Sequence, residues 1–267
     1  MCRLLGFVAR VPVAVRDVLG AEDFGRFTEL TRLHGDGWGM AWGGPNGMQR
    51  AVAPTAALAD PDYQRLSQQA LAPAGLVHLR WATDGLAIAT ENTHPFVAGD
   101  MAFAHNGNIA PIPELEGMLS AASMRELQGA TDSERYFQLV RQYIERVGSS
   151  VEGVQSAVTQ MLSHFRSASM NAMLLTADEL IVVHANSTAT PPLNDMQERY
   201  PGMVGAPPDH ATAYFQLRYR SDRDAVLVAS SGVPARGWTD LSANSLLVIG
   251  RRDLSVRTVD LVSAAAR

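Results

Sequence analysis

The sequence predicts an α+β fold in which two β-sheets are sandwiched by helices. Short apolar strands occupy the first part of the chain, amphipathic helices the middle, and strands again the last part. That order of elements favours sheets packed between helices in one layered domain. The chain has 267 residues, of which 46% are hydrophobic, so it can bury a sizeable core. It contains no internal repeat or low-complexity linker, and we expect a single domain over residues 1–267.

The first half of the chain is predicted to supply four strands and one helix. Residues 2–8 (CRLLGFV) begin as a strand almost at the first residue, and residues 37–43 (GWGMAWG) form its expected sheet neighbour. A polar, Pro-bounded stretch over 54–73 has helical character. Residues 75–82 (GLVHLRWA) are predicted as a buried strand, and 101–106 (MAFAHN) as a short strand that stops at an Asn-Gly pair.

Helices are predicted to dominate the middle of the chain. The expected helices span 112–128, 132–147 and 151–167, and the second is the clearest because its apolar side chains follow the helical period. After Ser169 the pattern returns to strands, at 170–176, 180–185, 213–219, 225–230, 244–249 and 254–260. The segment 186–212 is rich in Pro, Asn and polar residues, and we expect a long loop that covers part of the molecule.

Composition excludes several classes of function. The net charge is −5 and no basic stripe is present, so we expect no nucleic-acid partner. The apolar runs are too short for a membrane span and no secretion signal is recognisable, which favours the cytoplasm. All 22 basic residues are Arg, which excludes a lysine Schiff base. One Cys and seven His without ligand spacing give no support for a metal site, so we expect none. We also expect no organic cofactor, because the Cys2 chemistry described next does not require one.

Cys2 is the first candidate for chemistry. A small residue after the initiator Met permits removal of Met1, which would leave a thiol and a free α-amine on one residue. An α-amine titrates near pH ~8 in model peptides, so part of it is neutral at physiological pH. The amine can then act as the base that the thiol needs. The alternative is that Cys2 is only a small buried strand residue.

Two further motifs fit an amide substrate. Arg80, at the end of a strand, can grip a carboxylate with its guanidinium fork, or it can be a solvated residue at a sheet edge. Asn106 and Gly107 can donate to the oxyanion of a tetrahedral intermediate from a side-chain amide and a backbone N–H. The alternative for Asn106-Gly107 is a hairpin turn, for which this pair is a strong signal.

A fourth motif opens the predicted helix at 132. Thr131 and Glu134 form a capping-box pattern, and capping alone would explain them. Asp132 would lie in the first turn, where a carboxylate is electrostatically favourable. From there it could also bind a substrate α-ammonium group. Arg80 and Asp132 would then hold the two ends of an amino acid.

Five motifs in order resemble the class II glutamine amidotransferase domain of the N-terminal-nucleophile hydrolases. They are Met1-Cys2-Arg3, Gly35-Asp36-Gly37-Trp38-Gly39, Arg80-Trp81-Ala82-Thr83, His105-Asn106-Gly107-Asn108 and Thr131-Asp132-Ser133-Glu134. The resemblance implies a four-layer αββα sandwich with two mainly antiparallel sheets. It implies that Cys2 is the nucleophile and its amine the base, with Asn106 and Gly107 as the oxyanion hole. Arg80 and Asp132 match the residues that bind the substrate carboxylate and amine.

The resemblance extends to the rim of the glutamine pocket. Trp81 and Thr83 are expected to shape the pocket, and His94 belongs to a segment, Glu91-Asn92-Thr93-His94-Pro95-Phe96, that resembles one bordering it. If the α-amine is the base, His94 and His105 are expected to be hydrogen-bond partners rather than catalytic bases.

Two departures from the fused synthases of the family limit what the resemblance implies. This chain has Thr83-Asp84-Gly85 where those enzymes commonly carry Thr-His-Gly, and we expect no acceptor domain after the sandwich. The chain is most similar to the stand-alone subgroup, so ammonia would pass to a separate synthase subunit or simply be released. The alternatives are a γ-glutamyl amide or dipeptide hydrolase of the ergothioneine-pathway type, and a non-catalytic γ-glutamyl-binding module.

Overall fold

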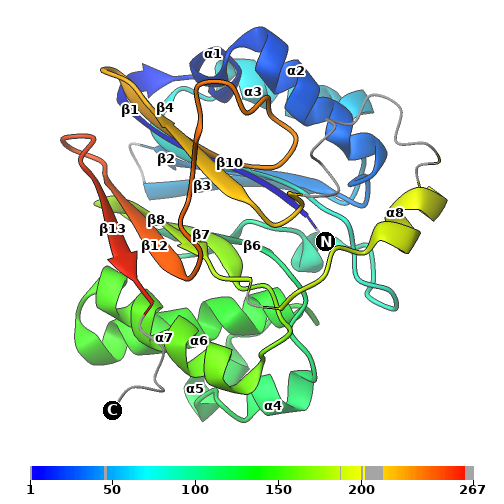
Figure 1. Cartoon of the computed structure of the whole chain (residues 1–267), viewed down its shortest axis with the longest axis vertical. Helices are drawn as coiled ribbons and strands as arrows, with labels where there is room; N and C mark the ends of the chain where they lie inside the picture. Colours follow the sequence, from blue (N-terminus) through cyan, green and yellow to red (C-terminus); the bar gives the residue numbers. More distant parts are fainter. Residues whose placement is uncertain (1, 45–46, 187, 200, 202–212, 262–267) are drawn as a thin grey trace.

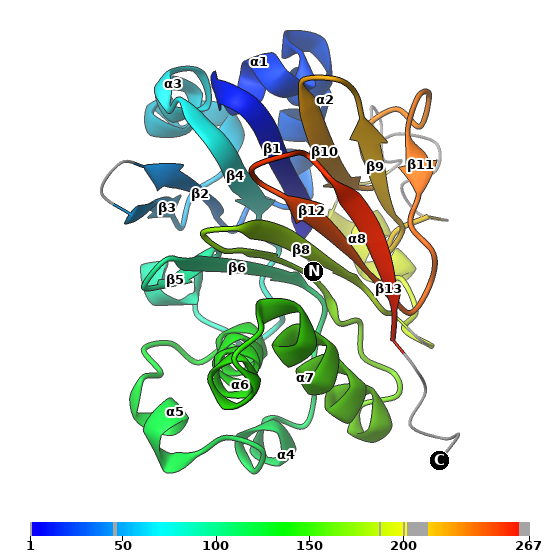
Figure 2. The same ribbon diagram turned by 90° about the vertical axis from the view of Figure 1, so that its left-hand side faces the viewer.

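The computed structural model describes residues 2–44, 47–186, 188–199, 201 and 213–261. Two antiparallel sheets lie face to face, with helices covering the outer face of each (Figure 1, Figure 2). Helices α1 to α3 lie on the first sheet, and α4 to α7 lie on the second (Figure 2). This arrangement confirms the predicted α+β class and the four-layer αββα sandwich.

The first sheet has seven strands in the order β11-β9-β10-β1-β4-β2-β3. Their bounds are Arg3–Val13 (β1), Trp38–Gly44 (β2), Gly47–Ala53 (β3), Ala72–Leu79 (β4), Leu217–Ser221 (β9), Ala225–Ser230 (β10) and Thr239–Asp240 (β11). Strand β1 pairs with β4 and β10, and β2 pairs with β4. The prediction that 37–43 would pair with 2–8 is therefore wrong, because β4 lies between them.

The second sheet has six strands in the order β13-β12-β8-β7-β6-β5. Their bounds are Phe96–Ala98 (β5), Met101–Asn106 (β6), Asn171–Leu175 (β7), Glu179–His184 (β8), Ser245–Gly250 (β12) and Val256–Asp260 (β13). Strand β6 has the predicted bounds of 101–106. It pairs with β7, which the chain reaches only after four helices, so the alternative of a hairpin at Asn106-Gly107 is wrong.

The predicted and observed helix bounds agree best where the sequence contains an N-capping residue. Helix α6 has the predicted bounds, and the Thr131 hydroxyl accepts from the Glu134 N–H. The single helix expected over 112–128 is instead two short ones, because the Ser120 side chain caps a new start. The bounds are Val15–Leu19 (α1), Ala21–Glu29 (α2), Pro61–Gln69 (α3), Ile112–Glu116 (α4), Ala121–Arg125 (α5), Asp132–Val147 (α6), Ser150–His164 (α7) and Leu193–Arg199 (α8).

Several elements differ from the sequence-based expectation. Helices α1 and α2 and strands β3, β5 and β11 were not predicted, and the helix expected over 54–73 is limited to α3 after a short 3-10 turn at Ala57–Ala59. Helix α8 lies inside the segment expected to be a loop. Residues 187, 200 and 202–212 of that segment lie outside the described residues. Within the described residues, no helix has the length and apolar character needed to cross a membrane.

The alternation of side chains along β1 decides what its first two residues face. Leu4 and Val8 belong to the core between the two sheets, whereas Leu5 and Phe7 belong to the core under α1 to α3. Because successive side chains of a strand point to opposite faces, Cys2 is on the inter-sheet side and Arg3 is on the other side. The nucleophile candidate thus faces the second sheet.

Gly39 allows two segments to approach closely, and its replacement tests this packing. A Cβ atom at Gly39 would collide with the backbone carbonyl of His94, which cannot move without displacing β5. We expect Gly39→Ala to lower the free energy of unfolding by about 1–3 kcal/mol. Gly25 lies in α2 with open space around it, so Gly25→Ala is the control and should raise stability by roughly 0.5–1 kcal/mol. Chemical denaturation measures both, and equal effects would contradict the close approach.

Candidate active site

Cys2 lies where three strand ends from the two sheets meet. It immediately precedes β1 and its side chain is buried. Its backbone N–H donates to Asn106 Oδ1 at 2.8 Å, and Asn106 is the last residue of β6 in the opposite sheet. Its sulfur lies 3.7 Å from the carbonyl oxygen of Trp81, just beyond the end of β4. The structure therefore places both the nitrogen and the sulfur of Cys2 against residues that the sequence predicted for the site.

Asn106 presents an unused donor beside Cys2. Its side chain is completely buried and its oxygen accepts from the Cys2 nitrogen, while its Nδ2 has no hydrogen-bond partner within the described part of the chain. The Ser169 hydroxyl donates to the Asn106 carbonyl at 2.9 Å and fixes the backbone. A buried donor without a partner is costly, and a ligand oxygen at Nδ2 would remove that cost. An unpaired buried donor beside Cys2 is compatible with the oxyanion-hole role predicted for Asn106.

Gly107 is expected to be the second donor, and the structure shows why no larger residue fits there. A Cβ atom at this position would collide with the carbonyl of Ser169 and with the ring of His105. The chain can pass between these groups only as glycine. The position of Gly107 directly after Asn106 is consistent with a backbone donor next to the side-chain donor.

Arg80 is a buried cation with part of its donor set unused. It is 3% exposed, and its Nη2 donates to the Ala87 carbonyl at 3.1 Å, while Nη1 has no partner in the described residues. Burial lowers the pKa of Arg80, and the charges of Cys2 and Asp36 oppose that effect. A guanidinium stays protonated in proteins, so Arg80 offers a charged donor to a carboxylate.

Asp132 is the first residue of α6 and is also buried. One of its oxygens accepts from the Ile109 N–H at 2.7 Å, which ties the helix start to the segment after Asn106. Asn92 links this region to Arg80, because its Nδ2 donates to the same Ala87 carbonyl and its oxygen accepts from the Ala130 N–H. The two ends of the predicted amino-acid clamp are thus held in one hydrogen-bonded frame.

His105 is part of that frame, and its ring nitrogens are both occupied. Nε2 lies 2.8 Å from the Ser169 carbonyl, which can only accept, so Nε2 carries the proton. Nδ1 then accepts from the Ser133 hydroxyl at 2.8 Å. Burial lowers the pKa of His105, which agrees with a neutral ring. The arrangement matches the expectation that His105 is a structural partner and leaves no nitrogen to act as a base on Cys2.

His94 lies in a second buried pair with His78. Its Nδ1 is 2.9 Å from His78 Nε2 and accepts from the His105 N–H at 3.5 Å. Burial lowers the pKa of both rings well below the usual value, and the Arg80 cation lowers each further. The contacts with His78 and His105 thus occupy Nδ1 of His94. Whether His94 contacts the substrate stays a prediction.

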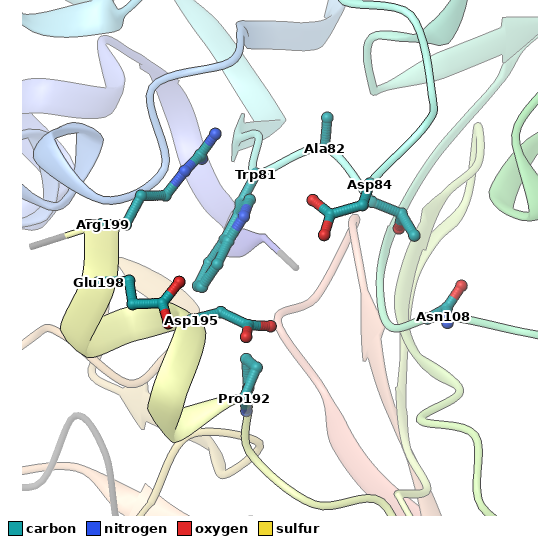
Figure 3. Close-up of a pocket in the computed structure, with 9 residues that line it drawn as sticks. Trp81, Ala82, Asp84, Asn108, Pro192, Asp195, Glu198 and Arg199 are labelled. Carbon is teal, nitrogen blue, oxygen red and sulfur yellow. The ribbon is translucent and has the colours of Figure 1, made fainter.

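A cavity of about 540 Å³ adjoins Cys2 through Trp81 (Figure 3). Its described lining combines the end of β4 with helix α8, and the residues are Trp81, Ala82, Thr83, Asp84, Asn108, Pro192, Asp195, Glu198 and Arg199. Trp81 and Thr83 were expected at the pocket. Cys2, Arg80, Asn106 and Asp132 are not in this lining, so the cavity lies beside the reacting groups, and Trp81 is the residue that both share.

Helix α8 is fastened over Trp81 by an ion pair that the sequence did not indicate. The Arg199 guanidinium contacts both oxygens of Asp36, at 2.8 and 3.0 Å, and lies 5.3 Å from the centre of the Trp81 ring. Asp36 also accepts from the Ala82 N–H at 2.9 Å. The carboxylate therefore fixes the chain after Arg80 and holds the helix that forms the other wall. Asp36 was within a quoted motif, but nothing in the sequence indicated Arg199 as its partner.

The described residues offer no site for a metal ion. No group of three or more His, Cys, Asp or Glu side chains among them is placed to bind one. Ser133 stood in a quoted motif without an assigned role and Ser169 was not singled out, yet they contact His105 and Asn106 respectively. Isolated serines in a helix start and a loop carry no signal that distinguishes them from capping or turn residues.

Comparisons with known proteins agree on one family. The sequence model of the family described as glutamine amidotransferases class-II matches residues 1–263. The "Putative glutamine amidotransferase" of Haemophilus influenzae is 31% identical over 150 residues, or 54% of this chain and 48% of that protein. The glutamine–fructose-6-phosphate aminotransferase (isomerizing) of Brucella abortus is 36% identical over 119 residues, or 45% of this chain and 18% of that protein. The matched part thus spans about half of the first relative and less than a fifth of the second.

Solved structures show the same fold. A glutamine aminotransferase class-II domain protein from Silicibacter pomeroyi matches with a TM-score of 0.63 and 17% identity, over 97% of this chain and 100% of that one. The glutamine phosphoribosylpyrophosphate amidotransferase of Bacillus subtilis matches with a TM-score of 0.62 and 14% identity, over 98% of this chain and 49% of that one. At these identities the likeness concerns the fold alone.

The buried histidines predict a loss of stability in acid. The folded protein keeps His78, His94 and His105 neutral, whereas the unfolded chain protonates them near the usual pKa of 6.5. Below pH 6.5 the unfolded state therefore binds more protons, and the free energy of unfolding falls by up to about 1.4 kcal/mol per pH unit for each histidine. Urea unfolding between pH 7.5 and 5 measures this slope.

Two variants test whether the buried histidines cause the pH dependence of the free energy of unfolding. His94→Gln should reduce the dependence on pH, whereas His164→Gln, at an exposed position at the end of α7, should leave it unchanged. Equal slopes in the wild type and His94→Gln would contradict the role assigned to burial.

Proposed function

The chain belongs to the class-II glutamine amidotransferases, and on that premise we propose that it cleaves the γ-amide of glutamine through a Cys2 thioester. The observation that carries this proposal is the contact between Cys2 and Asn106, in which Asn106 accepts from the Cys2 nitrogen and keeps its own Nδ2 unpaired. Nucleophile, base and oxyanion donor are thereby adjacent. We further propose that residues 1–267 act as one amidotransferase domain.

The proposed substrate-binding groups are the buried guanidinium of Arg80 and the buried carboxylate of Asp132. Arg80 has a free Nη1 for the α-carboxylate of a γ-glutamyl group, and Asp132 offers a carboxylate for its α-ammonium. Both groups are already desolvated. Asn92 donates to the Ala87 carbonyl that Arg80 also contacts, and it accepts from the Ala130 N–H, two residues before Asp132. Binding therefore needs little rearrangement of the protein, which is how positioning lowers a reaction barrier. The γ-amide carbon would then lie at the Cys2 sulfur.

Acyl transfer follows from the groups around Cys2. After Met1 is removed, the Cys2 nitrogen is a free amine held by Asn106 Oδ1, and it accepts the thiol proton. The sulfur bonds to the amide carbon, and the oxyanion is stabilised by Asn106 Nδ2 and the Gly107 N–H. The protonated amine returns its proton to the leaving nitrogen, and the C–N bond breaks. Water then cleaves the γ-glutamyl thioester, releasing glutamate and the free thiol.

The nitrogen leaves as ammonia when the substrate is glutamine. We propose that it is released or delivered to a separate synthase subunit. The support for such a subunit is family analogy, since the Brucella relative named above is an aminotransferase of which the matched region covers only 18%.

The cavity beside Trp81 favours a second candidate substrate, a γ-glutamyl amide with a larger leaving amine. Ammonia has no need for about 540 Å³ of space, whereas cavities of that size hold small organic ligands. The lining includes three carboxylates, Asp84, Asp195 and Glu198, and the charge of Arg199 is already paired with Asp36 (Figure 3). A leaving amine that carries a positive charge would fit this lining best.

Variants at Asn106 and Arg80 test the proposed roles by their different kinetic effects. Asn106→Ala removes an oxyanion donor, and we expect kcat for glutamine hydrolysis to fall about 10²–10³-fold with a small change in KM. Arg80→Met removes a carboxylate ligand and should act mainly on KM. Cys2→Ala should abolish turnover. If Cys2→Ala hydrolyses glutamine at the wild-type rate, the proposed function is wrong, and binding without turnover by the wild type would indicate a binding module.

The leaving-amine preference is tested with three γ-glutamyl amides, made from a diamine, a neutral alkylamine and an amino acid. The carboxylates on α8 are exposed, so we expect a modest preference, roughly three- to tenfold in kcat/KM, for the cationic diamine derivative. The double variant Asp195→Asn, Glu198→Gln should remove most of it, and Glu145→Gln, on the exposed face of α6, is the matched control. Glutamine as the only accepted substrate would exclude this second candidate.

A further inference from the structure

Arg3 is a completely buried cation next to the nucleophile. Its side chain is 0% exposed, and within the described part of the chain it forms no ion pair with a carboxylate. Its Nη1 donates to the Tyr214 carbonyl at 3.1 Å and to the Ser231 hydroxyl at 2.5 Å. The guanidinium lies 4.0 Å from the centre of the Tyr214 ring. Its Nε and Nη2 have no hydrogen-bond partner among the residues that the structure describes.

Stability alone does not account for this residue. Burying a charge without a counter-ion is expensive, and unsatisfied donors add to that cost. Burial lowers the pKa of Arg3, but a guanidinium remains protonated in proteins, so the charge stays in place. A buried group whose environment is this unfavourable is more often found at a functional site than in a plain core.

Arg3 is close enough to Cys2 for its positive charge to act on the Cys2 thiol and amine. The two residues are adjacent in the chain, and the alternation along β1 places Arg3 behind the sheet and Cys2 in front of it. Little water separates them, because both residues are buried. The only cation that the mechanism uses near Cys2, Arg80, would be neutralised by the substrate carboxylate during reaction. Among the described residues Arg3 has no carboxylate partner, so within this part of the chain its charge is not neutralised during the reaction.

We propose that Arg3 is a positioning residue that acts on Cys2 electrostatically and favours the thiolate together with the unprotonated α-amine. This inference rests on the proposed function of Cys2. A nearby positive charge disfavours protonation of an amine and favours loss of a proton from a thiol, so both effects have the same direction. Arg3 touches no substrate. Its contribution is to keep the base free and the nucleophile reactive at neutral pH.

Other charged and titratable groups surround Cys2 and must be kept constant in a test. Tyr214 lies against Arg3 from the segment before β9, and burial raises the pKa of its hydroxyl to about 12, so it stays neutral. Arg80 lies at the end of β4, with Asp36 beside it. His105 and Asp132 approach from β6 and α6 through the frame around Asn106. The variants below leave these groups in place.

The test measures alkylation of Cys2 by iodoacetamide against pH, alongside kcat/KM for glutamine. Cys2 is the only cysteine of the chain, so the label reports on one thiol. We expect Arg3→Met to move the pH midpoints of alkylation and of kcat/KM upward by about one unit, which lowers both rates roughly tenfold near neutral pH. KM for glutamine should stay within about twofold, and Arg3→Lys should restore most of the reactivity.

Two further variants keep the result interpretable. Arg146→Met removes an arginine that also lies 4.0 Å from a tyrosine ring, that of Tyr143 near the far end of α6, and should change neither midpoint. Arg3→Gln keeps a donor for Tyr214 and Ser231 without the charge, and should give the same shift if Arg3→Met does not fold. An unchanged alkylation midpoint in the neutral variants would overturn the proposal. Alkylation needs no glutamine site, so this failure is distinct from a failure of the proposed function.

Discussion

The contact on which the site depends is the hydrogen bond from the Cys2 nitrogen to Asn106. It joins the residue before the central strand of one sheet to the last residue of a strand in the other sheet. Neither residue could take part in catalysis without the sandwich, because 104 positions of sequence separate them. The bond also fixes the rotamer of the Asn106 amide, so that its donor side stays unpaired in a dry environment. The packing of the two sheets therefore determines that Asn106 presents an unpaired hydrogen-bond donor next to Cys2.

A general feature of the site is that its polar groups are buried before any ligand arrives. Arg3, Arg80, Asn106 and Asp132 are each less than 5% exposed, and the first three hold donors that none of the described residues satisfies. The surrounding hydrogen bonds from Ser169, Asn92 and Ser133 keep these groups in place. Such preorganisation costs stability and lowers the reorganisation needed during reaction. The neutral histidine cluster behind the site is consistent with this, since it avoids further buried charge.

The sequence was sufficient for the fold class, for β6 and α6 and for the order of the motifs. Those elements carry local signals, namely an apolar strand that ends at Asn106 and a capped periodic helix that begins after Thr131. Pairing was less predictable, because the insertion of β4 between β1 and β2 depends on long-range packing. The ion pair of Asp36 with Arg199 and the burial of Arg3 were also not predictable. Both depend on which faces meet after folding, and an arginine in a sequence gives no sign of its partner.

The central claim is that Cys2, freed of Met1, is the nucleophile for a γ-glutamyl group. The most direct measurement is intact-protein and peptide mass spectrometry after exposure to a diazoketone analogue of glutamine. The account predicts a chain that begins at Cys2 and carries one adduct on that residue, with labelling suppressed by excess glutamine. A retained Met1, an adduct on another residue, or labelling that glutamine does not affect would contradict it.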